Sequence, residues 1–273
     1  MRFLILLITV LLVRFTPLRR GMRPDLAVSW ASYCARLAER RPGWRALVCL
    51  LLPLLPLELA FWMLADVAYG FFVLTLGVLV LLFGLGGNEL LHAFGRRFEQ
   101  AWGRGDQAAA ALIAENDLGL QASDDQTLLM QVRGRLLREA LSGYFVPVLW
   151  FLLLGPVGAL GYRLLRLFVD RLASDEQSYA GSLVHAMEWL PARLLAASFA
   201  LVGHFDQVLA ALRGVWSDWD QSVEPLLVRA ADAALTGEAS AEKNQTILAP
   251  TRALLVRAML AWAVPVALLA LLG

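Results

Sequence analysis

Lysine is almost absent from this chain of 273 residues, and Lys243 is the only one among its 24 basic residues. Because Lys243 stands in Ala-Glu-Lys-Asn, no Gly-x-x-x-x-Gly-Lys-Ser/Thr loop exists and a P-loop nucleotide site is excluded. Cysteine is equally scarce, and Cys34 and Cys49 are predicted to be unpaired thiols, not a disulfide framework or metal cluster. The net charge of +1 offers no basic excess, so nucleic acid is not expected as a partner.

Charged residues of either sign are also few. They make up 17% of the chain and hydrophobic residues 59%, against about 25% and 45–50% in soluble domains. Four long stretches carry the excess, each close to the roughly 20 apolar residues that cross a bilayer: residues 46–64, 69–85, 144–162 and 258–272. Continuous apolar runs without alternation favour helices. The sequence therefore predicts an all-α, polytopic helical protein of the bacterial inner membrane, with four to six membrane helices and the lipid bilayer as partner.

Arginine placement predicts the topology, since basic residues near membrane helices stay in the cytoplasm. Residues 3–13 are apolar and no small-residue cleavage site follows them, so we expect a retained membrane or surface helix. Residues 14–45 hold eight arginines and should be cytoplasmic. The connection after residue 64 contains Asp66 and no positively charged residue, so it should face the periplasm. Whether residues 189–205 span is open: if they do, residues 206–252 are cytoplasmic and the C-terminus is periplasmic, and otherwise both reverse.

The domain organisation follows from these assignments. Residues 1–273 are predicted to form a single membrane domain, with a cytoplasmic helical insertion at 88–142 and a soluble loop at 206–252 before the last membrane helix. Within the insertion, Asp106 is a predicted N-cap, and Ser123 with Gln126 forms a predicted capping box.

Glycines recur on two of the predicted helices. A spacing of seven or three residues keeps small side chains near one face, where another backbone can approach closely. We expect both series to serve helix packing: Gly70, Gly77 and Gly84, and Gly155, Gly158 and Gly161.

Ionisable residues within apolar stretches are the first candidates for function, because burying a charge at membrane depth costs at least a few kcal/mol. Glu58 and Arg193 are such residues, and one arrangement pairs them in a polar pocket; Arg193 could equally extend to the interface. Two Glu/His pairs at helical spacing, 89 with 92 and 185 with 188, lack the further carboxylates of a di-metal site. The sequence predicts no metal and no cofactor.

Two motifs resemble a known family. Residues 138–163, Arg-Glu-Ala-Leu-Ser-Gly-Tyr-Phe-Val-Pro-Val-Leu-Trp-Phe-Leu-Leu-Leu-Gly-Pro-Val-Gly-Ala-Leu-Gly-Tyr-Arg, are similar to a signature of AmpE proteins and of the CobD/CbiB membrane proteins of cobalamin biosynthesis. The segment 185–203, with Trp189-Leu190-Pro191-Ala192-Arg193-Leu194, resembles a second signature of the same superfamily. The order of predicted membrane helices matches as well.

The AmpE branch is favoured, because the Asn-Thr-Leu-Asp-type motif of the cobalamin enzymes is absent after Tyr162. The resemblance implies a regulatory protein of β-lactamase induction and peptidoglycan recycling. It also implies contact with a muropeptide amidase through the arginine-rich cytoplasmic segments, and a muropeptide or nucleotide as candidate ligand.

A ligase function is the alternative that the resemblance leaves open, although a role without catalysis is favoured. In that hypothesis Glu139 is a carboxylate of the site, and Arg138, Arg163 and Arg193 hold phosphate or carboxylate groups. Arg138 and Arg163 flank a predicted membrane helix, so anchoring that helix is a second interpretation of both.

Overall fold

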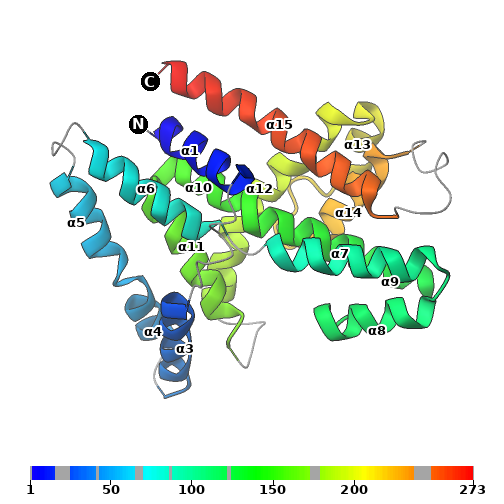
Figure 1. The fold of residues 1–273 in the computed structure, drawn as a ribbon, viewed down its shortest axis with the longest axis horizontal. Helices are drawn as coiled ribbons and strands as arrows, with labels where there is room; N and C mark the ends of the chain where they lie inside the picture. Colours follow the sequence, from blue (N-terminus) through cyan, green and yellow to red (C-terminus); the bar gives the residue numbers. More distant parts are fainter. Residues whose placement is uncertain are drawn as a thin grey trace. The chain divides into compact units, whose positions relative to one another are not determined.

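The computed structural model describes residues 2–15, 25–40, 43–64, 70–85, 88–121, 124–172, 179–236 and 247–272, which form helices joined by turns and short loops. No strand occurs in these ranges (Figure 1). The helices are α1 Arg2–Phe15, α3 Asp25–Arg40, α4 Gly43–Leu51, α5 Leu54–Leu64, α6 Phe71–Gly84, α7 Asn88–Gly103, α8 Gln107–Leu118, α9 Asp125–Ala140, the π-helix η2 Leu141–Phe145, α10 Val146–Leu154, α11 Pro156–Val169, α12 Tyr179–Val202, α13 Phe205–Leu212, α14 Val223–Ala234 and α15 Ala249–Leu272.

The chain divides into two compact units. Unit 1 comprises Met1–Gly86 and Gly143–Glu188, and unit 2 comprises Gly87–Ser142 and Trp189–Gly273. The predicted insertion at 88–142 coincides with the first segment of unit 2. Residues 206–252, predicted to be a soluble loop, contain α13, α14 and the start of α15.

In unit 1, α11 packs against α3, α4, α5, α6 and α10, and α1 packs against α6. Two of the glycines that were expected to serve packing do so here: a Cβ at Gly77 would lie 2.6 Å from Ile5 of α1, and one at Gly84 would lie 3.4 Å from Ala159 of α11. Because these positions have no side chain, the helices approach closely. Gly70 and Gly155 instead lie at helix ends, with φ of 81° and 78°.

The prediction that residues 144–162 form one membrane helix is wrong. The chain turns at Gly155, whose φ of 78° and ψ of −164° are accessible essentially to glycine alone, and Pro156 begins α11. A Cβ at Gly158 would lie 2.7 Å from the carbonyl oxygen of Trp150, so α10 and α11 pack tightly side by side. Hydropathy is unbroken across this turn, which is why the sequence pattern concealed it.

Two helical segments among the described residues are long and apolar enough to cross a bilayer: Trp44–Leu64, which joins α4 and α5, and Asp125–Leu154, which runs from α9 through η2 into α10. The core helix of a water-soluble protein can have the same length and composition, and 56% of the apolar window in Asp125–Leu154 is buried. Only 6% of the window in Trp44–Leu64 is buried. The shorter helix α6 is also apolar.

The α12 helix covers most of residues 189–205, whose membrane crossing the sequence left open. Its 24 residues are enough to span, but it is not among the segments that are sufficiently apolar. Glu188 and Arg193 interrupt its hydropathy, and both are buried.

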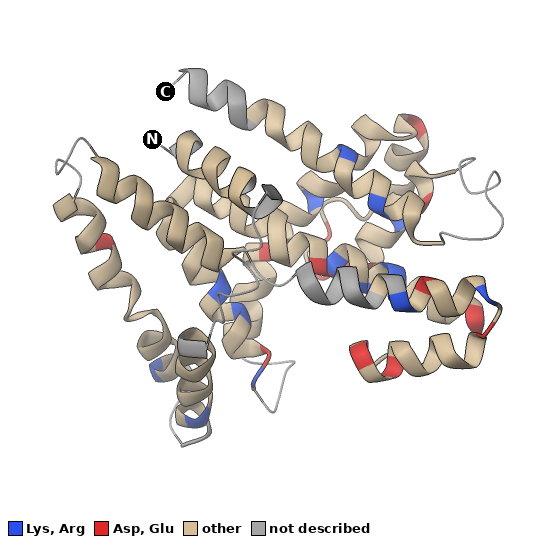
Figure 2. Ribbon diagram, in the orientation of Figure 1, with Lys and Arg blue, Asp and Glu red and all other residues tan. Residues whose placement is uncertain are grey.

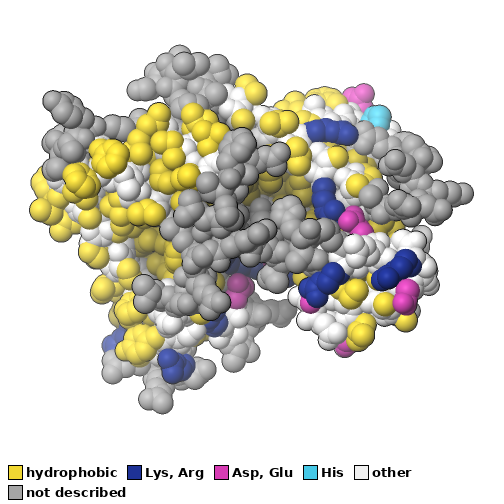
Figure 3. Space-filling view, in the orientation of Figure 1, with side chains coloured by type: hydrophobic (Ala, Val, Ile, Leu, Met, Phe, Trp, Pro, Cys, Tyr) yellow, Lys and Arg dark blue, Asp and Glu magenta, His cyan; other side chains and the backbone are white. Residues whose placement is uncertain are grey.

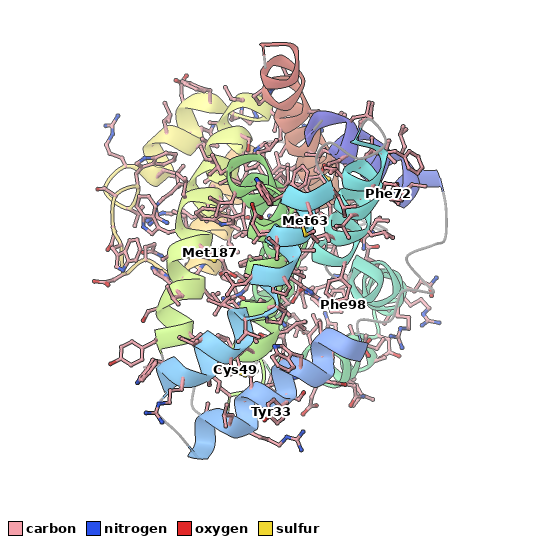
Figure 4. The ribbon with its side chains drawn as sticks, turned by 90° about the vertical axis from the view of Figure 1, so that its left-hand side faces the viewer. Tyr33, Cys49, Met63, Phe72, Phe98 and Met187 are labelled. Carbon is pink, nitrogen blue, oxygen red and sulfur yellow. The ribbon has the colours of Figure 1, made fainter. Side chains whose placement is uncertain are left out.

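The surface of α4, α5 and α6 in unit 1 is strongly apolar. Trp62 is 77% exposed and Leu55 is 73% exposed, and α5 has no buried residue. Figure 3 shows hydrophobic side chains gathered over α5 and α6. Glu58 on α5 is the only charged residue within the sequences of these two helices, and it is drawn red in Figure 2. Figure 4 places Met63 near the end of α5 and Phe72 near the start of α6.

Unit 2 contains the predicted cytoplasmic helices α7, α8 and α9, packed on a small core that includes Phe98, Ala110, Leu128 and Leu248. The predicted N-cap Asp106 is confirmed, since its side chain accepts from the Ala109 backbone N–H at 3.0 Å. The α9 helix is capped by Asp124, which accepts from the Thr127 N–H at 2.9 Å. The predicted cap Ser123 lies outside the described residues.

Candidate functional site

A cleft of about 1030 Å³ opens in unit 2 between α9 and α14. On α14 its lining recurs at Pro225, Val228, Arg229 and Asp232, a spacing that puts all four on one helical face. The full lining is Gly119, Leu120, Gln121, Met130, Gln131, Gly134, Arg135, Glu224, Pro225, Val228, Arg229 and Asp232. The wall thus combines apolar side chains with two arginines and two carboxylates.

Gly134 sets the separation of the two helices. A Cβ at this position would lie 3.3 Å from Cγ2 of Val228, tighter than ordinary van der Waals contact. The opposite face of α9 buries Leu128, Val132 and Leu136, which fixes the rotation of the helix. Consequently Gln131 and Arg135 lie on the side that lines the cleft.

Two of the predicted site residues form ion pairs with charged residues that line the cleft. Arg138 Nη1 lies 3.6 Å from Glu224 Oε1, so it links α9 to α14. Glu139 Oε1 lies 3.0 Å from Arg135 Nη2, one helical turn earlier. Neither Arg138 nor Glu139 lines the cleft. Within unit 2 they are therefore positioned to orient the lining residues.

A third ion pair completes this arrangement. Arg133 Nη2 lies 2.6 Å from Asp232 Oδ1, and Arg133 Nε donates to Thr251 Oγ1 of α15 at 3.2 Å. Both lining carboxylates and Arg135 thus have partners of opposite charge. Arg229 has no ion-pair partner among the described residues, and it is exposed on the cleft wall.

Two buried polar atoms on the cleft wall lack hydrogen-bond partners within the described part of the chain. They are Oε1 of Gln131 and Nε of Arg135. A buried polar atom without a partner costs about 1–3 kcal/mol, so such atoms commonly mark places where another molecule supplies the missing bond. Two residues of the lining therefore hold one acceptor and one donor without partners, both buried beneath the surface of the cleft.

Arg193, the predicted pocket residue of α12, lies elsewhere in unit 2 and is only 2% exposed. Its Nε donates to the carbonyl oxygen of Trp216 at 2.9 Å, Nη1 donates to that of Trp189 at 3.2 Å, and Nη2 donates to that of Asp218. The guanidinium group also lies over the Trp189 ring, 4.0 Å from its centre. Because the guanidinium group donates to three backbone carbonyls, two of them in the following loop, Arg193 stabilises the conformation of that loop.

The loop held by Arg193 is residues 213–222, between α13 and α14. Trp219 stacks on Trp189 with ring centres 5.7 Å apart, while Trp216 and Trp219 remain exposed. Asp218 closes the turn by accepting from the Asp220 N–H at 3.0 Å. The loop has a defined conformation because a buried cation and a stacked ring pair fix it.

Unit 1 holds a second buried polar cluster, which links α11 to α12. The Tyr162 hydroxyl donates to Glu188 Oε1 at 2.7 Å, and Arg166 Nη1 lies 3.4 Å from the same oxygen. Arg166 Nε also lies 3.3 Å from Asp170 Oδ1. Glu188 is 2% exposed, so Tyr162 and Arg166 compensate a carboxylate that has lost its water.

The other two predicted residues lie in unit 1. Glu58 is exposed on α5, and Arg163 is half-buried on α11. The predicted pairing of Glu58 with Arg193 joins residues of different units and stays a prediction. Three residues of the cleft, Gln131, Arg135 and Arg229, were not predicted. The Arg135–Glu139 spacing of four residues could have indicated that pair.

The described residues contain no cluster of three or more His, Cys, Asp or Glu side chains that could hold a metal ion. His185 lies on α12 near the Glu188 cluster, whereas the side chains of residues 89 and 92 lie outside the described residues. Cys34 and Cys49 are both free thiols. Burial, together with the neighbouring Cys49 thiol, raises the pKa of Cys34 to about 12.

The described residues thus define a helical protein with two candidate membrane helices among them and polar sites in each unit. The family model of the "Regulatory signalling modulator protein AmpE" matches residues 4–273, so the chain belongs to the AmpE family and a regulatory role follows. Protein AmpE of Shigella flexneri is 29% identical over 132 residues, which cover 45% of this chain and 46% of that protein. The chain thus matches about half the length of this curated relative. No solved structure matches it. The resemblance to CobD/CbiB proteins stays a prediction.

Proposed function

We propose that this chain is a multi-pass protein of the bacterial inner membrane that regulates β-lactamase induction and peptidoglycan recycling. Membership of the AmpE family supports the regulatory part. The observation that carries the membrane part is the segment Trp44–Leu64, which is strongly apolar over 21 residues although only 6% of its apolar window is buried.

Lipid explains this exposure better than water does. Leaving apolar surface in water costs about 25 cal/mol per Å², and large contiguous apolar patches are rare on soluble monomers. In a bilayer the same side chains meet hydrocarbon, and a helix satisfies all its backbone polar groups internally. The apolar helix α6, which packs against α5, extends this surface. Four to six membrane helices remain our proposal for the whole chain.

The partners proposed for this function are the bilayer and the muropeptide amidase of the same pathway, with a muropeptide or nucleotide as candidate ligand. The α9–α14 cleft supports a ligand-responsive role, since Arg229 lines a space large enough for a small molecule and two further lining residues carry buried polar atoms without partners. The arginine-rich segments supply a basic surface for a protein partner.

The test is a deletion of the gene in a strain with inducible β-lactamase, complemented by the wild-type chain or by Arg229→Gln. Deletion should change β-lactamase activity after induction, and wild-type complementation should restore it. Immunoblots of membrane fractions serve as the control for expression. Unchanged induction in the deletion strain would contradict the proposed pathway, and ATP-dependent amide formation by the purified chain would contradict a purely regulatory role.

The topology has its own test. Single cysteines at Gly181 and Ser222, introduced with Cys34 and Cys49 replaced by alanine, report their compartment through labelling by a membrane-impermeant maleimide. Because α12 is not apolar enough to count as a candidate span, we expect both positions to be labelled from the same side. Labelling from opposite sides would show that the segment between them crosses the bilayer.

A further inference from the structure

The charged groups in and beside the α9–α14 cleft indicate the charge of the ligand that it can bind. Its wall and the ion pairs behind it hold four arginines, at 133, 135, 138 and 229, and three carboxylates, at 139, 224 and 232. Three salt bridges pair the three carboxylates with three of these arginines, and Arg229 is the arginine that remains without a carboxylate. The cleft is thus suited to a ligand with one negative charge, whereas a polyphosphate would also be repelled by Glu224 and Asp232.

The two atoms without hydrogen-bond partners indicate which polar groups the ligand must carry. Arg135 Nε is a donor and Gln131 Oε1 is an acceptor; both belong to residues that line the cleft but are themselves buried, so a ligand reaches them only when these two side chains rotate. A ligand that satisfies them must present an acceptor and an N–H or O–H donor together. A carboxylate with a neighbouring amide N–H provides both, as at the C-terminal residue of a peptide.

Apolar side chains supply the rest of the lining. Leu120, Met130, Pro225 and Val228 contribute hydrophobic surface to the same cleft. The volume of about 1030 Å³ lies at the upper end of the range for small-molecule sites, which is enough for a few residues of a peptide.

We propose that the α9–α14 cleft binds a short N-acylated peptide by its free C-terminal carboxylate, with Arg229 as the charge partner and Gln131 as the acceptor for the adjacent amide N–H. This inference deepens the proposed regulatory function and rests on it for its biological meaning. The carboxylate lies against Arg229 and Arg135, and the apolar side chains of the peptide lie against Met130 and Val228.

Isothermal titration on the full-length chain in detergent micelles tests the assignment. The probes are N-acetyl-leucyl-alanine with a free carboxylate, the same dipeptide as its C-terminal amide, inorganic phosphate and ATP. The acid should bind saturably and at least tenfold more tightly than the amide. Equal affinity for acid and amide, no saturable binding of the acid, or tighter binding of phosphate or ATP would each overturn the proposal.

Two variants locate the binding. Arg229→Gln should weaken binding of the acid at least fivefold, while the matched control Arg213→Gln, an exposed arginine of the 213–222 loop, should leave it unchanged. Gln131→Leu removes an unsatisfied buried oxygen, so it should lower affinity while keeping or raising the thermal midpoint. A purely structural Gln131 would instead give a lower midpoint, and that result, like equal effects of the two arginine variants, would refute the site.

The outcomes separate this inference from the proposed function. Normal peptide binding with unchanged β-lactamase induction in the deletion strain would refute the pathway alone. Altered induction in that strain, with no binding of the acid probe, would refute the peptide site alone.

Discussion

Arg193 and Trp189 stand one helical turn apart in α12, and the guanidinium carbon of Arg193 lies 4.0 Å from the centre of the Trp189 ring. The indole of Trp189 stacks in turn on Trp219 from the 213–222 loop. Since Arg193 also donates to the carbonyls of Trp216 and Asp218, one buried side chain ties helix and loop together by two kinds of contact. The motif Trp-Leu-Pro-Ala-Arg-Leu thus acts within unit 2 as a loop anchor.

Arg193→Ala should therefore destabilise the protein by about 2–4 kcal/mol, because it removes charge-assisted hydrogen bonds and leaves carbonyls unsatisfied. Arg193→Lys should recover only part of this loss, since an ammonium group lacks the planar fork that reaches several acceptors. Thermal unfolding in detergent measures both, and limited proteolysis should show earlier cleavage at residues 213–222. Arg213→Ala, in the same loop but exposed, is the control and should stay within about 0.5 kcal/mol of wild type. Equal stability of all three variants would contradict the anchor.

The hydrogen bond between Tyr162 and Glu188 gives a second prediction. Tyr162→Phe should cost about 1–3 kcal/mol, because it leaves a buried carboxylate with one partner fewer. Tyr179→Phe, on an exposed tyrosine of the same unit, should be neutral. A double-mutant cycle with Glu188→Gln should show coupling above about 0.5 kcal/mol, and additive effects would mean that the two groups do not interact.

Gly155 provides a backbone prediction. Its φ of 78° and ψ of −164° belong to a region that other residues rarely adopt, so Gly155→Ala should cost about 1–3 kcal/mol. Gly119→Asn is the matched control, since Gly119 has the left-handed φ of 67° and ψ of 24° that asparagine tolerates. Urea unfolding of both variants compares them. If Gly155→Ala lowered the free energy of unfolding no more than Gly119→Asn does, the result would argue against the sharp turn between α10 and α11.

Cys34 yields a prediction about pH. Its pKa of about 12 means that the folded protein keeps it as the neutral thiol at pH 8–9, and it is also fully buried. Because the thiolate is the form that reacts, iodoacetamide should modify Cys34 far more slowly than a free cysteine in this range. The neutral thiol stabilises the native state fully below the ordinary pKa of about 9, and this contribution is lost as pH rises toward 12. Mass spectrometry of the alkylated chain measures the rate, with the urea-unfolded protein as reference. Rapid modification at pH 8 of the folded chain would contradict the buried, neutral thiol.

Particular residues show how far the sequence predicts this structure. Asp106 was recognised as an N-cap because capping depends on neighbours in sequence, and Arg193 was recognised because a lone charge interrupts an apolar helix. Two of the three carbonyl partners of Arg193 could not be predicted, since they lie 23 and 25 residues further along the chain. Arg138 was predicted as a site residue, but its partner Glu224 depends on the packing of α9 against α14. The turn at Gly155 was missed because hydropathy carries no information on φ.

The central claim is that Trp44–Leu64 lies in lipid, and spin-label accessibility tests it most directly. Trp62→Cys, in a chain with Cys34 and Cys49 replaced by alanine, is labelled and reconstituted in liposomes, and Leu112→Cys on α8 serves as the comparison because Leu112 is also exposed. Collisions with oxygen and with a water-soluble nickel chelate are measured by electron paramagnetic resonance. We predict high oxygen and low nickel accessibility at position 62, and the reverse at position 112. Nickel accessibility at position 62 as high as at position 112 would place this helix in water and contradict the account.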